Sequence, residues 1–318
     1  MMRGQRLQNL LDPTILCFLV GLVAGLVKSD LKLPKSSYEF VSMYLLLAIG
    51  LKGGVQLSKT NIQDFLPALY GTVFIGVCVP IIAYYYLIAT KKFSRVNAGA
   101  IAAHYGSVSA VTFATALSYL ESLGESYEAY ITTLMVVLEI PALCVGVYLA
   151  KGGFKNVETK KKLLEDIFFG KSIFLLGGGL LIGYVAGAEK MQPLDPLFVD
   201  LFKGFLALFL LEMGVMTSQQ MSHLKKAGII LAIFAITMPL ISGALGLFVA
   251  KAVGMSTGGA HLLAILAASS SYIAAPSAMK IAVPEASPTL YLTASLAITF
   301  PFNITVGIPL FYYLAQLL

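Results

Sequence analysis

Charged residues are scarce in this chain. Asp, Glu, Lys and Arg make up 12% of its 318 residues, whereas 58% are hydrophobic. A soluble globular domain carries about 25% charged residues, so the composition excludes an ordinary soluble fold. Basic residues are not interleaved with aromatic ones, which excludes a nucleic-acid surface despite the formal net charge of +6. The composition predicts an all-α protein that crosses a membrane many times and contacts lipid.

The groups that carry enzyme chemistry are also few. Cys17, Cys78 and Cys144 lie in apolar runs without CxxC spacing, and the three His residues are scattered along the chain. No Ser/His/Asp order and no spacing of metal ligands emerges. The clusters Gly50–Gly54 and 177–179 do not follow strands, so they indicate helix packing or hinges rather than a nucleotide loop. We therefore expect no catalytic site and no cofactor.

Hydrophobic runs bounded by charged residues, Pro and Gly predict ten membrane spans, each near the roughly 20 residues that a membrane helix needs. The first run is expected to be a retained helix and not a cleaved signal, because Asp12-Pro13 interrupts it and a similar short run recurs at 172–188. The chain divides into a first repeat at 1–150, a linker at 151–170 and a second repeat at 171–318. The predicted spans are 12–27, 38–57, 64–90, 97–120, 127–150, 171–188, 196–217, 225–253, 258–282 and 287–317.

The two halves resemble each other weakly. Gly54 and Gly214 each follow an apolar run, and Pro141 and Pro301 each lie inside one; both pairs are separated by 160 positions. Five spans per half is an odd number, so the second half must enter the membrane from the opposite side. The sequence therefore predicts a 5+5 inverted repeat, an arrangement common in secondary transporters.

Most of the 22 Lys and Arg residues fall in alternate loops, whereas the loop 121–128 contains three Glu and neither basic residue. By the positive-inside rule, the basic loops are cytoplasmic and both chain termini lie outside. The Lys-rich segment 151–171 is the longest of these loops. The basic loops are 28–37, 91–96, 151–171, 223–226 and the turn near 280.

Two predicted spans, the fourth and the ninth, contain small hydroxyl residues with Gly or Pro at their centres. These segments, 104–112 and 268–276, lie about 162 residues apart at matching places in the two halves. Unwound backbone survives at membrane depth only where it is buried in protein or lines a cavity. Paired interrupted helices indicate the binding site of a secondary transporter. Close packing of helices through small residues is the alternative explanation.

A broken helix offers free N–H groups and a positive dipole end to an anion. No Lys or Arg lies near either break, so backbone donors and hydroxyls must supply the site. His104 borders the first break, where its imidazole either donates to a substrate or makes a structural hydrogen bond. The candidate substrate-binding residues are Gly106, Ser107, Val108, Ser109, Ser269, Ser270 and Ser271.

Glu139 lies inside an apolar run, directly before Ile140-Pro141. A carboxylate at mid-helix costs roughly 2.5–3.5 kcal/mol, so it should face a partner or an ion. It is either a Na⁺ ligand, a proton-carrying group or a partner of Lys52. Carbonyls at the C-terminal ends of the first half-helices also suit Na⁺ as a coupling ion. The Na⁺ candidates are Glu139, Thr112, Ser271 and Tyr272.

Several motifs in order resemble the sodium-dependent bicarbonate transporter family of cyanobacteria and other bacteria. They are Gly50-Leu51-Lys52-Gly53-Gly54, Gly106-Ser107-Val108-Ser109, Ser126-Tyr127-Glu128-Ala129, Glu139-Ile140-Pro141-Ala142-Leu143, Ala268-Ser269-Ser270-Ser271 and Gly307-Ile308-Pro309-Leu310-Phe311.

The resemblance implies a core domain that moves against a gate domain in an elevator-like manner. It also implies Na⁺-driven bicarbonate symport across the bacterial plasma membrane, with substrate held where the fourth and ninth helices cross. A homo-oligomer and a PII-like cytoplasmic regulator are further implications. The chain departs from the family pattern at Tyr272, where the family has Asp, and at Glu139, where the family has Asp. Lys52 replaces a small polar residue of the family.

Two other functions remain open at this stage. An organic-anion carrier, for a small carboxylate or a bile-acid-like substrate, would use the same broken-helix architecture, and the volume at the helix crossing separates it from a carrier of small anions. A non-transporting membrane receptor or scaffold is the alternative of a different class. A receptor or scaffold of this kind would not explain why the protein contains two interrupted helices, whose unpaired backbone groups cost free energy inside a membrane.

Overall fold

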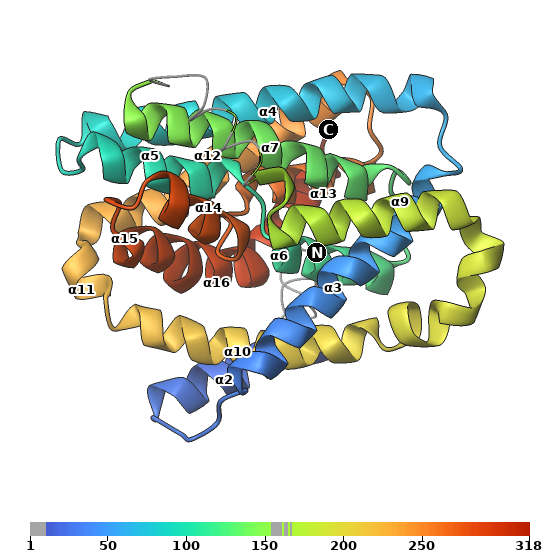
Figure 1. Cartoon of the computed structure of the whole chain (residues 1–318), viewed down its shortest axis with the longest axis horizontal. Coiled ribbons are helices and arrows are strands. Elements are labelled where there is room, and N and C mark those ends of the chain that lie inside the picture. The colour runs from blue at the N-terminus through green and yellow to red at the C-terminus, as the bar shows by residue number, and fades with distance from the viewer. Residues whose placement is uncertain (1–10, 154–160, 162–164, 166) are drawn as a thin grey trace.

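The computed structural model describes residues 11–153, 161, 165 and 167–318, which form helices and turns and no strand (Figure 1). The first half contains α2 (Pro13–Leu26), α3 (Lys35–Leu57), α4 (Ile62–Ala89), α5 (Arg95–Gly106), α6 (Ala110–Leu123) and α7 (Ile131–Lys151). The second half begins with α9 (Lys171–Met191), η1 (Gln192–Leu194), η2 (Pro196–Asp200), α10 (Phe202–Met221), α11 (Leu224–Ala227) and α12 (Ile229–Ala252). It continues with α13 (Thr257–Ala268), α14 (Ala274–Ala282), α15 (Pro288–Leu292), η3 (Thr293–Thr299), α16 (Phe300–Phe302), η4 (Asn303–Gly307) and α17 (Ile308–Ala315).

Each predicted span coincides with one of these helices, or with a run of them, to within a few residues. Seven helical spans among the described residues are long and apolar enough to cross a membrane, and α2 and α13 are shorter apolar helices. The prediction of an all-α, multi-pass membrane protein is therefore confirmed. The count of ten spans and the division at 1–150, 151–170 and 171–318 stay predictions.

Polar caps fix where the two broken spans begin. The Ser94 hydroxyl accepts a hydrogen bond from the N–H of Asn97 at the start of α5, 3.2 Å away. The Ser256 hydroxyl accepts from the N–H of Gly259 at the start of α13, at 3.1 Å. Serine at this position satisfies one of the N–H groups that a helix start leaves open. Both spans thus begin in the same way, 162 residues apart.

Four helices, α2, α3, α9 and α10, form a group that we call the four-helix group. In it α3 packs along α9 and α2 packs along α10, as Figure 1 shows. Glycines bring the backbones together: a Cβ on Gly54 would lie 2.1 Å from the Leu180 carbonyl oxygen, and one on Gly214 would lie 2.2 Å from that of Phe18. The Gly50–Gly54 cluster therefore serves helix packing. Gly177 and Gly178 have open space beside them.

The remaining helices, α4–α7 and α12–α17, form the broken-helix group. α5 packs between α4 and α7, and α13 packs against α12 and α17. Within the span 95–123, which contains α5 and α6, 94% of the most apolar stretch is buried. Within the span 171–194, which contains α9, the corresponding figure is 28%. The interrupted helices thus lie inside the protein, whereas α9 has a broad exposed face. This burial is what unwound backbone requires inside a membrane.

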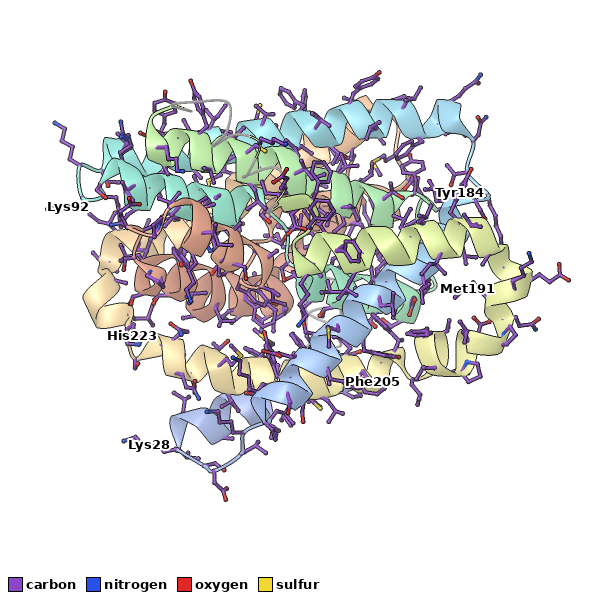
Figure 2. The ribbon with its side chains drawn as sticks, viewed as in Figure 1. Lys28, Lys92, Tyr184, Met191, Phe205 and His223 are labelled. Carbon is purple, nitrogen blue, oxygen red and sulfur yellow. The ribbon has the colours of Figure 1, made fainter. Side chains whose placement is uncertain are left out.

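Connecting segments separate to two ends of the molecule. Figure 2 shows Lys28, Lys92 and His223 along one edge, whereas Tyr184 and Met191 lie toward the opposite edge. Lys28, Lys92 and His223 belong to three of the loops predicted to share one side of the membrane. The arrangement agrees with that alternation of loops and leaves open which side is cytoplasmic.

Candidate functional site

Both interrupted spans contain a stretch of extended backbone. Between α5 and α6, Ser107 has φ −83° and ψ 167°, and Ser109 has φ −102° and ψ 106°. Between α13 and α14, Ser269 has φ −76° and ψ 168°. Ser107 and Ser269 end their helices alike, each N–H bonding to the carbonyl four residues earlier, at 3.1 and 2.9 Å. The helices are interrupted at the predicted places, and Gly106 is the last residue of α5.

Serine side chains start the second half of each broken helix. The Ser109 hydroxyl accepts a hydrogen bond from the N–H of Thr112 at 3.1 Å. The Ser271 hydroxyl accepts one from the N–H of Ala275, also at 3.1 Å. Serine oxygens compete with backbone carbonyls for N–H groups and favour helix starts over helix interiors. Ser109 thus caps α6, and the Ser271 side chain bonds to the first turn of α14.

The two breaks cross and bond to each other. The N–H of Ser271 donates to the carbonyl of His104 at 2.8 Å. The N–H of Ser109 donates to the Ser269 hydroxyl at 3.0 Å, and the Ser109 hydroxyl donates to the Tyr272 hydroxyl at 3.1 Å. All of these residues are buried. Segments 162 residues apart in the chain are therefore joined at one point inside the broken-helix group.

Several of the N–H groups expected to face an anion already have partners. Those of Ser109, Thr112, Ser271 and Ala275 bond to a serine hydroxyl or to the His104 carbonyl. The N–H groups of Val108 and Ala110 donate no hydrogen bond to a described residue. Both residues line a small cavity at the crossing. The backbone donors open to an anion are thus fewer than the sequence suggests.

The fifth span of each half supplies a polar side chain to the adjoining break. Glu139 of α7 is 2% exposed, and its carboxylate accepts a hydrogen bond from the Ser107 hydroxyl at 3.3 Å. Asn303 of η4 is fully buried, and its side-chain N–H donates to the Ala268 carbonyl at 2.9 Å. The Asn303 side-chain oxygen has no partner among the described residues. One break therefore faces a carboxylate and the other faces an amide.

Three of the four Na⁺ candidates share a cavity. Glu139, Ser271 and Tyr272 all line the small cavity at the crossing, whereas the Thr112 hydroxyl bonds to Ser109 at 2.9 Å. Within the described residues, no three His, Cys, Asp or Glu side chains gather closely enough to hold a metal ion. Oxygens around Na⁺ at this place would come from one carboxylate and several neutral groups, a mixture that hard cations accept.

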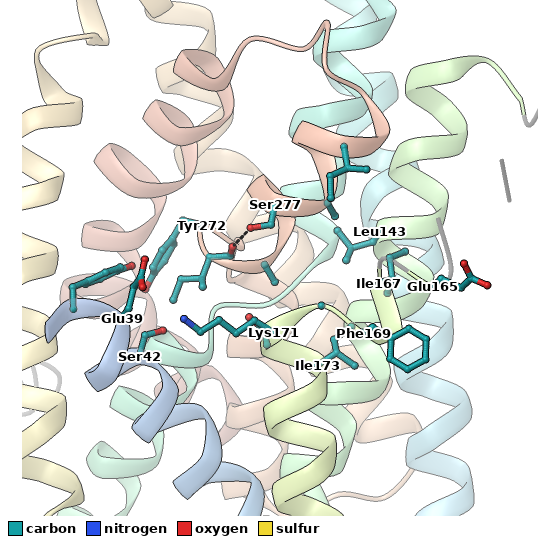
Figure 3. Close-up of a pocket in the computed structure, with 17 residues that line it drawn as sticks. Glu39, Ser42, Leu143, Glu165, Ile167, Phe169, Lys171, Ile173, Tyr272 and Ser277 are labelled. Carbon is teal, nitrogen blue, oxygen red and sulfur yellow. Dashed lines mark hydrogen bonds between the residues drawn. The ribbon is translucent and has the colours of Figure 1, made fainter. Parts of the chain in front are cut away.

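The small cavity has a volume of about 20 Å³, room for about one water molecule. It adjoins an open cavity of about 650 Å³, and Ser172, Tyr272, Ile273 and Ala274 line both. Figure 3 shows Lys171 extending from the start of α9 toward Ser42 of α3, with Tyr272 on the neighbouring wall. Glu39, Glu165 and Lys171 are the charged residues of the large cavity. The crossing thus communicates with one face of the molecule.

Other predicted residues lie away from the crossing cavity. The His104 imidazole bonds through Nδ1 to the Ala100 carbonyl at 2.7 Å and stacks on Tyr291, with ring centroids 4.1 Å apart. Its hydrogen bond is therefore structural and lies within its own helix. Lys52 pairs with Glu121 at 2.7 Å and not with Glu139. Ser270 is buried beside the crossing, and its hydroxyl has no partner among the described residues.

The sequence interpretation missed two features of this site. Asn303 lies two residues after Pro301, which the sequence analysis paired with Pro141; an amide at this place in an apolar span is the signal that identifies it. Ser172 is the second residue of α9, and nothing in its sequence context indicates that it lines both cavities. Its position depends on how the four-helix group packs against the broken helices.

Comparison with known proteins agrees with this architecture. No curated protein matches the chain. The family model of the Na⁺-dependent bicarbonate transporter superfamily matches residues 13–316, which include both helix breaks, the carboxylate of α7 and both helix groups. A match over nearly the whole chain shows the family, and the protein belongs to the Na⁺-dependent bicarbonate transporter superfamily.

Proposed function

We propose that this protein is a Na⁺-coupled symporter of bicarbonate or a similar small anion. One observation supports it above all: two broken helices cross inside the protein at a small polar cavity that continues into a large open one. Membership in a family of Na⁺-dependent bicarbonate transporters agrees with that geometry. The binding residues we assign are Gly106–Ser109 and Ser269–Ser271, in a 5+5 inverted repeat of ten spans.

Transport in this proposal proceeds by alternating access. The four-helix group acts as the gate domain and the broken-helix group as the core domain, which moves against it. The large cavity lies beside Lys171, at the end of the predicted cytoplasmic linker, so in this proposal it opens to the cytoplasm. Ion pairs join the two groups elsewhere, at Glu121 with Lys52 and Lys203. Both chain termini then lie outside.

Na⁺ would bind beside the anion, with Glu139 as the charged ligand and Ser271 as a neutral one. One positive charge that moves down a potential of 100 mV supplies about 2.3 kcal/mol, before any concentration gradient. A monovalent anion that moves with Na⁺ crosses the same potential at an equal cost, so the Na⁺ concentration gradient drives the uphill movement. A bacterial plasma-membrane location, a homo-oligomer and a PII-like regulator remain expectations from the family.

The test is uptake of labelled bicarbonate into proteoliposomes, with and without an inward Na⁺ gradient. We expect uptake above equilibrium only with the gradient, and none without protein. Equal uptake under both conditions would refute Na⁺ coupling. An absence of bicarbonate uptake, with Na⁺-driven uptake of another anion, would leave the architecture and change the substrate.

An organic-anion carrier is the second candidate, because the large cavity of about 650 Å³ would admit a larger substrate. The crossing itself favours the small anion, since its cavity holds about one water molecule. Competition between bicarbonate and organic anions for uptake distinguishes the two candidate functions. Excess small carboxylates or bile acids should leave bicarbonate uptake unchanged if the small cavity is the site, and should block uptake if the large one is.

A further inference from the structure

A chain of hydroxyl groups runs through the crossing, and its hydrogen bonds all point in one direction. The Thr112 hydroxyl donates to the Ser109 oxygen at 2.9 Å, and the Ser109 hydroxyl donates to the Tyr272 oxygen at 3.1 Å. Ser109 also accepts from the N–H of Thr112. Each hydroxyl has one proton to give, so Thr112 and Ser109 have both committed theirs.

The last group of this chain, the Tyr272 hydroxyl, accepts a hydrogen bond and still holds its own proton. That proton has no acceptor among the residues that the structure describes. Tyr272 is 8% exposed, so bulk water does not surround the hydroxyl. A buried donor without a partner costs about 1–3 kcal/mol. The site is therefore suited to a ligand that accepts this hydrogen bond.

Tyr272 is also held at the right place to meet such a ligand. It lines the small cavity together with Ser271 and Glu139, and it lines the large cavity as well. Its ring packs edge-on against Phe300 of α16, with centroids 5.2 Å apart. A ring held from the side and a hydroxyl held by Ser109 give the remaining proton a defined position.

We propose that Tyr272 is a specificity-determining residue: its hydroxyl donates a hydrogen bond to an oxygen of the transported anion as the anion passes between the small and large cavities. This rests on the proposed function and adds the substrate class, a small oxyanion. A neutral phenol donates a directed hydrogen bond and binds an anion less tightly than a cationic side chain would. Oxyanions, which are strong hydrogen-bond acceptors, should be preferred over halides of similar size.

The experiment compares anion-dependent thermal stabilisation of the purified protein with that of Tyr272→Phe, in the presence of Na⁺. The probes are bicarbonate, formate, nitrate and bromide. Loss of a hydrogen bond to a charged ligand should raise the oxyanion Kd roughly tenfold or more, whereas bromide binding should change little. Tyr86→Phe is the matched control, because it removes a hydroxyl that bonds to Thr237 at 2.9 Å, outside both cavities.

A second variant shows whether weaker binding in Tyr272→Phe comes from the lost hydroxyl or from misfolding. 3-Fluorotyrosine at position 272 keeps the ring and the hydroxyl and makes the hydroxyl a stronger donor. We expect tighter oxyanion binding, with bromide binding nearly unchanged. Equal oxyanion affinity in the unmodified, Tyr272→Phe and fluorinated proteins would overturn the role of Tyr272 alone. If no anion stabilises the unmodified protein, the proposed function fails and this inference fails with it.

Discussion

The two helix breaks begin with the same backbone and differ in chemistry. Ser107 and Ser269 end their helices with nearly equal dihedral angles, and a serine two positions later accepts a hydrogen bond from an N–H of the next helix in each case. The first break, however, faces the carboxylate of Glu139, whereas the second faces the amide of Asn303. The repeat thus supplies the scaffold twice, and the side chains of the fifth spans make one half a candidate cation site.

The largest effect is expected at the end of α5, where the first break begins close to neighbouring side chains. A Cβ on Gly106 would lie 2.8 Å from Pro80 Cδ and 3.0 Å from Ala142 Cβ. Gly106→Leu should therefore displace the first break, cost about 1–3 kcal/mol or more through overpacking, and abolish uptake and anion-dependent stabilisation. Ser270→Leu should do the same at the second break.

Gly177→Leu is the control for this pair, because nothing lies within 4 Å of the position that its Cβ would take. That variant should transport normally. Full anion-dependent stabilisation in both Gly106→Leu and Ser270→Leu would place the binding site elsewhere. If only one of them retained stabilisation, the two breaks would be shown to contribute unequally.

The second prediction tests the charge difference between the breaks. Glu139→Gln keeps an oxygen that can accept from Ser107 and removes the negative charge. We expect the Na⁺ concentration for half-maximal uptake to rise about tenfold, which corresponds to about 1.4 kcal/mol. Glu212→Gln is the matched control: this buried carboxylate accepts a hydrogen bond from the N–H of Leu33 at 2.8 Å and lines neither cavity. Unchanged Na⁺ activation in Glu139→Gln would leave that residue a structural role.

The third prediction compares the serines that end α5 and α13. Ser269→Ala leaves the buried N–H of Ser109 without its acceptor, which should cost about 1–3 kcal/mol. Ser107→Ala removes a longer hydrogen bond of 3.3 Å to Glu139, and this carboxylate also borders the small cavity, where a water molecule can replace the hydroxyl, so its cost should be smaller. Thermal unfolding of the two variants in detergent gives the ranking. A larger loss of stability in Ser107→Ala would contradict the hydrogen-bond network described for the crossing.

Sequence patterns predict most of this fold because helix starts and stops are local. The serines at 94, 109, 256 and 271 act on N–H groups only a few residues away, so hydropathy and capping place the spans and both breaks. Glu139 is apparent for the same reason: one charge in an apolar run requires a partner.

The remaining features of the site depend on contacts between distant segments. The bond between Ser109 and Ser269, the role of Asn303 and the pairing of Lys52 with Glu121 all require the packing of helices that lie far apart in the chain. Likewise, the sequence suggests a set of free N–H donors, but the crossing lets serines of one break satisfy the other. The volume of the small cavity follows from that packing and from no single residue.

The smallest expected effect concerns how each broken helix is tied to the four-helix group. At the end of α6, Glu121 pairs with Lys52 of α3 at 2.7 Å and with Lys203 of α10 at 3.6 Å. At the end of α14, Lys280 forms no ion pair with a described residue. Within the part of the chain that the structure describes, ion pairs therefore hold the first broken helix and not the second, on the side away from the large cavity.

Breaking that link should shift the protein away from the state in which the large cavity is open. The Lys52 and Glu121 side chains are 37% and 35% exposed, so solvent screens the pair and its contribution is about 0.2–1 kcal/mol. Lys52→Met should then lower the rate at which Cys placed at Ser277, in the large cavity, reacts with a thiol reagent, by at most about fivefold. The measurement requires a background without Cys17, Cys78 and Cys144, and Lys59→Met, at an exposed lysine outside the pair, is the control. An unchanged labelling rate in Lys52→Met would mean that the Lys52–Glu121 pair does not hold the first broken helix against the four-helix group.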